Sequence, residues 1–133
     1  MGHWYTIGLF AGLGTAFGIA STGVLRRAVF GFPVAAVIAV ALALAFDGTA
    51  EAVAGAVGAA CGAFGSAPLI GGALRRGGTR GGTAVLLAVT SIVAAAIAFI
   101  PIVGYLEAIA VPVLGFRVRR RAPDRHAGLR TLA

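Results

Sequence analysis

The stretch Trp4–Leu25, WYTIGLFAGLGTAFGIASTGVL, contains no charged residue and is followed directly by Arg26 and Arg27. At about 1.5 Å per residue, a helix of this length crosses the roughly 30 Å hydrocarbon core of a bilayer. Trp4 and Tyr5 at its start are residues typical of the membrane–water interface. The stretch therefore predicts a transmembrane helix.

The composition extends this interpretation to the whole chain. Of its 133 residues, 59 % are hydrophobic and only 11 % are charged, whereas soluble domains carry roughly 25 % charged residues. A small soluble domain must cover a large surface with polar groups, which this sequence lacks. The single cysteine, Cys61, also excludes a disulfide scaffold. We expect an all-α integral membrane protein in the cell membrane.

Three more apolar runs follow, and the last of them is the hardest to divide. The last run, Thr83–Phe116, is too long for one membrane span and too short for two, and Pro101 and Pro112 interrupt it. We expect a fourth span, Thr83–Ile100, and then a short returning segment, 101–116, which crosses obliquely, re-enters the membrane or lies along its interface. The runs are Ala28–Phe46, Ala52–Leu74 and Thr83–Phe116.

The basic residues predict the orientation in the membrane. All eleven are arginines, against four acids, and the net charge is +7. They lie between the apolar runs or after the last one, and arginine-rich loops of this kind mark the cytoplasmic side. We therefore expect an external N-terminus and a basic cytoplasmic tail, 117–133. Because few aromatic residues accompany the arginines, we expect no nucleic-acid partner.

An internal repeat relates the two halves of the chain. The segments Gly14–Arg27 and Cys61–Arg76 both contain Ala-Phe-Gly followed by Leu-Arg-Arg. Since both arginine pairs follow odd-numbered spans, the copies run in the same direction. We expect one transmembrane domain, 1–116, with four transmembrane helices as two parallel-repeated helical hairpins, about 4–46 and 52–100. The segment 101–116 adds a short fifth or re-entrant element.

Small residues recur at every fourth position in the first and third spans. Such faces allow two helix backbones to approach closely, because no side chain separates them. The pattern predicts a tight helix pair or a subunit interface between these spans; generic packing in an alanine-rich chain is the alternative. The glycines expected in this packing are Gly8, Gly12, Gly14, Gly18, Gly58, Gly62 and Gly65.

Glu107 is the one acid within the last apolar run. A carboxylate inside a membrane is costly and is typical of ion or proton handling; the alternative is a position near the outer interface, where it costs little. The hydroxyls of Thr15, Thr90 and Ser91 have a structural explanation, because each can bond to a carbonyl of its own helix.

The sequence offers no catalytic or metal-binding constellation. His3 and His126 lie at opposite ends of the chain, and there is one cysteine, so we expect no enzyme activity, no metal and no cofactor. Arginines directly after the last apolar run are expected to bind anionic lipid headgroups. These are Arg117, Arg119, Arg120 and Arg121.

Two functions remain open. One is an oligomeric channel or transporter built from glycine-packed hairpins, since a chain this small has too few helices to enclose a pathway alone. The alternative is an accessory or scaffold subunit of a larger membrane complex, since few polar side chains are available to line a pathway.

Overall fold

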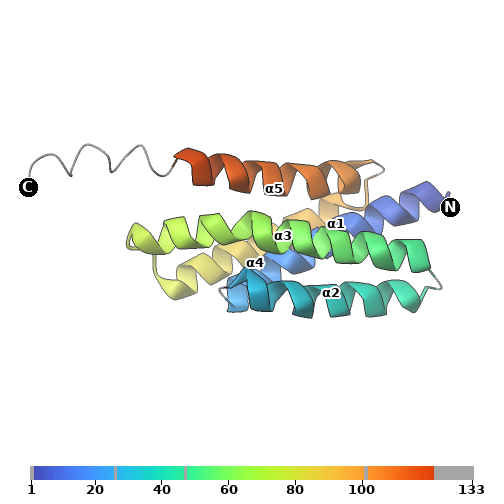
Figure 1. Ribbon diagram of the computed structural model, residues 1–133, viewed down its shortest axis with the longest axis horizontal. Helices are drawn as coiled ribbons and strands as arrows, with labels where there is room; N and C mark the ends of the chain where they lie inside the picture. The colour runs from blue at the N-terminus through green and yellow to red at the C-terminus, as the bar shows by residue number, and fades with distance from the viewer. Residues whose placement is uncertain (1, 26, 47, 101, 122–133) are drawn as a thin grey trace, which may run out of the picture.

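The computed structural model describes residues 2–25, 27–46, 48–100 and 102–121, and within these ranges it contains five helices and no strand. The helices run back and forth, so that α1, α3 and α5 point one way and α2 and α4 the other (Figure 1). They are α1 (His3–Leu25), α2 (Ala28–Leu44), α3 (Thr49–Arg75), α4 (Arg80–Ile97) and α5 (Val103–Arg121).

The α1–α3 pair forms the centre of the bundle. These two helices contact each other and every other helix, whereas α2 touches neither α4 nor α5 within the described residues. In Figure 1, α2 and α5 lie on opposite sides of α3. The most deeply buried apolar side chains are alanines, so the helices can lie close together. They are Ala35, Ala39, Ala43, Ala59, Ala63 and Ala98.

Three helices, α1, α3 and α4, are long and apolar enough to cross a membrane, and α2 is a shorter apolar helix. The outward faces of α2 and α4 carry large apolar side chains that are exposed over most of the helix length. A soluble monomer rarely presents continuous apolar surface of this kind, so the surface is compatible with a membrane location. The exposed residues include Val34, Val37 and Ile38 of α2 and Val85, Leu86, Val89 and Ile92 of α4.

The last apolar run divides differently from the expectation. The helix α4 begins at Arg80 rather than Thr83, because the Thr79 hydroxyl accepts a hydrogen bond from the Gly82 amide at 3.2 Å and caps the first turn. Two glycines in that turn disfavour a helix, which made the segment resemble a loop in the sequence.

The helix α5 is longer than the returning segment expected from the sequence. It passes through Pro112 without ending and continues beyond Phe116 to Arg121. Its 19 residues correspond to about 28 Å, close to the thickness of the hydrocarbon core. The first residues of the expected tail are therefore helical, whereas residues 122–133 lie outside the described residues.

The two expected hairpins are packed differently. The helix α2 contacts both α1 and α3, but α4 packs mainly against α1 and touches α3 little. Each even-numbered helix thus lies on the odd-numbered helix of the other half. The fold is a central parallel pair with three helices around it, and these contacts do not confirm the two repeated hairpins expected from the sequence.

Candidate functional site

Four of the seven glycines singled out in the sequence lie where α1 meets α3. Gly14 and Gly18 face α3, and Gly58 and Gly62 face α1. A methyl group added at any of the four would collide with backbone atoms of the partner helix; at Gly58, for example, it would meet the Ala11 carbonyl oxygen. The two backbones are therefore in direct contact, within one chain.

The other three glycines face α5 instead. The Tyr105 ring covers Gly8, and Gly65 lies against Val111. Gly12 approaches Gly104 at the start of α5. Two glycines of α5 that sequence reasoning missed, Gly104 and Gly115, complete this contact: a methyl group on either would meet a backbone carbonyl oxygen, of Gly8 and Gly65 respectively. The helix α5 is thus held closely against α1 and α3.

Glu107 lies in this contact, and its side chain is buried within the bundle. The residue is 7 % exposed, and its Oε2 lies 3.2 Å from the place where a Gly12 Cβ would be. Ala98 and Gly104 also border Gly12 at this point. Buried Oε2 has no hydrogen-bond partner among the described residues. Because an unsatisfied buried polar group destabilises a fold, its presence is an indication of function.

Two tyrosines hold the start of α1 against the connection between α4 and α5. The Tyr5 hydroxyl donates to the Phe99 carbonyl oxygen at 3.0 Å, and the Tyr105 hydroxyl donates to the Trp4 carbonyl oxygen at 2.6 Å. We call these four residues the tyrosine clasp. In the same connection Ile102 has a φ of +76°, a left-handed conformation that is unfavourable for a β-branched residue.

A second buried carboxylate, that of Glu51, has a structural explanation. Its Oε1 accepts a hydrogen bond from the Thr6 hydroxyl at 2.6 Å and lies 3.3 Å from His3 Nδ1. It stands in the first turn of α3, where a negative charge interacts favourably with the helix dipole. Glu51 therefore ties α3 to α1, although its Oε2 is also buried without a partner.

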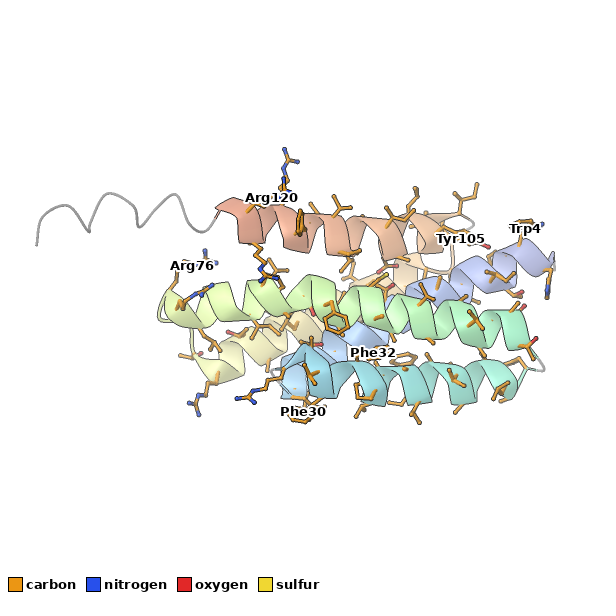
Figure 2. The ribbon with its side chains drawn as sticks, viewed as in Figure 1. Trp4, Phe30, Phe32, Arg76, Tyr105 and Arg120 are labelled. Carbon is orange, nitrogen blue, oxygen red and sulfur yellow. The ribbon has the colours of Figure 1, made fainter. Side chains whose placement is uncertain are left out.

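The described arginines gather at one end of the bundle. There α1 ends, α2 begins, α3 ends, α4 begins and α5 ends (Figure 1). Figure 2 shows Arg76 and Arg120 at this arginine end, and Trp4 and Tyr105 at the opposite, tyrosine end. The Arg120 guanidinium carbon lies 4.5 Å from the centre of the Phe116 ring. The residues at the arginine end are Arg27, Arg75, Arg76, Arg80, Arg117, Arg119, Arg120 and Arg121.

The hydroxyl groups considered in the sequence bond to their own helices. Thr15 donates to the Ala11 carbonyl oxygen, Thr90 to that of Leu86 and Ser91 to that of Ala88, at 2.8–2.9 Å. The predicted bonds of these hydroxyls to their own helices are confirmed. In the part of the chain that the structure describes, no three His, Cys, Asp or Glu side chains lie close enough to hold a metal ion.

Comparison with known proteins returned no match: no family model fits the sequence, and no curated protein or solved structure is significantly similar to it.

Proposed function

We propose that this chain is a non-enzymatic membrane protein of the channel or transporter type, in which Glu107 takes up and releases an ion or a proton. The observation that carries the proposal is the buried Glu107 Oε2, which no described residue bonds. Glu51 is equally buried, but Thr6 and His3 account for its position. The Glu107 Oε2 has no such partner among the described residues. An apolar side chain at this position would avoid the free-energy cost of burying a carboxyl group.

The proposal predicts that Glu107→Gln stops ion movement. The amide keeps the shape of the side chain but has no site to bind and release a proton or cation. In liposomes containing the purified protein, we expect the flux of protons or monovalent cations to fall about a hundredfold or more, the lower end of the usual effect of an acid–base group. A pH-sensitive dye inside the vesicles, with an imposed gradient, measures it.

Glu51→Gln is the matched control, because it changes a second buried carboxylate that already has partners. We expect this variant to retain most of the flux. Equal flux in native protein and Glu107→Gln would contradict the proposed function. Equal loss of flux in both variants would show that replacing either buried carboxylate has this effect, and would contradict a specific role of Glu107.

We further propose that all five helices cross the membrane with the arginine end in the cytoplasm. In a chain whose Cys61 is replaced by alanine, we expect Thr49→Cys to react with a membrane-impermeant maleimide added outside intact cells. We expect Gly81→Cys to react only after the cells are opened. Both positions are exposed, and a Cβ at Gly81 meets nothing within 4 Å. Reaction of both from the same side would contradict this orientation.

A single chain needs partners to form a pathway. The buried hydroxyls of Thr15 and Thr22 are bonded to carbonyls of α1 itself, so the central pair offers little to line a polar route. This supports a homo-oligomer, in which the pathway lies between copies. The same observation favours the second candidate, an accessory or scaffold subunit of a larger complex. Absence of any Glu107-dependent flux from the purified oligomer would favour the accessory role.

A further inference from the structure

We infer that Glu107 exchanges a proton, and not a metal cation, with the solution at the tyrosine end of the protein. We infer further that the tyrosine clasp covers Glu107 at that end and keeps water from it. The inference rests on the proposed function and adds the chemical identity of the ion, the side from which it enters and the element that controls its entry.

The surroundings of Glu107 suit a proton. Its neighbours at Gly12 are Ala98 and Gly104, which bring no oxygen-bearing side chain. The backbone carbonyls of α1 and α5 around Gly12 and Glu107 are engaged in helical hydrogen bonds. A metal cation such as Mg²⁺ or Ca²⁺ takes about six or more oxygen ligands, whereas a proton needs one carboxyl oxygen. One buried, unpartnered Oε2 supplies that oxygen.

The position of Glu107 along α5 favours the tyrosine end. It lies about one helical turn, or about 6 Å, from the start of α5 at Val103, and about 15 Å from Arg117. Between Glu107 and the arginine end, the backbone of α5 packs directly against that of α3. There Val111 lies on Gly65, and a methyl group at Gly115 would meet the Gly65 backbone. On the side toward the tyrosine end one such contact stands at Gly104, where a methyl group would meet the Gly8 carbonyl oxygen.

Beyond Gly104, the cover on the side of the tyrosine end consists of side chains. The Tyr105 ring lies over Gly8, one turn of α1 before Gly12. Its hydroxyl is fixed to the Trp4 carbonyl oxygen, and the hydroxyl of Tyr5 is fixed to Phe99 on the other side of the connection. Both bonds are partly open to the exterior and can break while the helices remain intact. The ring can then swing away from Gly8 and admit water to Glu107.

The test measures access to Glu107 directly. In purified protein in bilayers, the infrared band of the protonated carboxyl group, identified by its absence in Glu107→Gln, shifts when hydrogen is exchanged for deuterium. Tyr5→Phe and Tyr105→Phe each remove one hydroxyl and keep the ring. We expect each to speed the exchange about fivefold, because one hydrogen bond stabilises the closed state by about that factor. We expect the double variant to exchange faster than either single variant.

Thr90→Val is the control, because it also removes a hydroxyl bonded to a carbonyl but lies on the exposed side of α4. We expect native exchange in this variant. Native exchange in both single tyrosine variants and in the double variant would overturn the role of the clasp. The single variants each keep one bond of the clasp intact, so they remain informative if the double variant does not fold.

A second measurement tests the identity of the ion. The carboxyl band is titrated with pH in Na⁺, K⁺ or Mg²⁺ and in choline at equal ionic strength. We expect the same titration in all four salts. A shift to lower pH in any metal salt would show that the metal competes with the proton, and would overturn the inference. Both measurements need no gradient, so they stand even if Glu107→Gln leaves the flux unchanged and the proposed function fails.

Discussion

The variant Gly62→Ala is expected to lower the free energy of unfolding by about 1–3 kcal/mol, the usual range for overpacking, and Gly62→Leu to prevent α1 and α3 from packing together. The added Cβ would meet the Thr15 carbonyl oxygen and lie 3.0 Å from the Thr15 Cα. These are backbone atoms, so no side-chain rotation relieves the collision. Thermal unfolding in detergent, followed by circular dichroism, measures the loss.

Gly71 supplies the matched control in the same helix. A Cβ there meets only a guanidinium nitrogen of Arg75, at 3.9 Å. Alanine is more favourable than glycine inside a helix by about 1 kcal/mol, so Gly71→Ala is expected to keep or raise the melting temperature. Equal melting temperatures for Gly62→Ala and Gly71→Ala would mean that the contact between α1 and α3 contributes nothing to stability.

The second large effect is expected from the end of α5. We propose that the four arginines from Arg117 to Arg121 bind anionic lipid headgroups, as expected from the sequence. Each basic group near such a surface contributes about 1 kcal/mol. Changing all four to serine should therefore lower thermal stability strongly in bilayers with anionic lipid and little in zwitterionic bilayers. The difference should shrink as salt is added, because salt screens exposed charges.

Replacing the same four residues with lysine is the control, because it preserves the charge. We expect lysine to retain most of the stability in anionic bilayers. A small loss common to both lipids is expected from the Arg120–Phe116 contact, since an exposed cation–π contact contributes about 0.5–1 kcal/mol. A large and equal loss in both lipids would instead indicate protein contacts and contradict lipid binding.

Much of the helical architecture could be predicted because it depends on local sequence. Apolar runs bounded by charge gave α1 and α3 to within a few residues. The small-residue spacing drew attention to Gly14, Gly18, Gly58 and Gly62, which lie in the contact between α1 and α3. A helix face free of side-chain bulk is visible in one sequence, because it recurs with the period of the helix.

The surroundings of Glu107 could not be predicted, because they depend on how α5 is rotated. Proline at position 112 suggested a break, yet the helix continues through it. Once α5 is continuous, Gly104, Glu107 and Gly115 fall on one face at helical spacing. That spacing was a usable signal. The bond between Glu51 and Thr6 had no such signal, because the two residues are distant in sequence.

The parallel arrangement of α1 and α3 has a consequence for the biogenesis of the protein. Two parallel helices cannot be joined by a short turn, so in the proposed arrangement of five spans α2 has to return the chain across the bilayer before α3 can enter. While the ribosome is still making α2, the glycine face of α1 has only lipid or the insertion machinery beside it. The contact between α1 and α3 can therefore form only after α3 has been made, and a chain that ends before α3 leaves the glycine face of α1 without its partner.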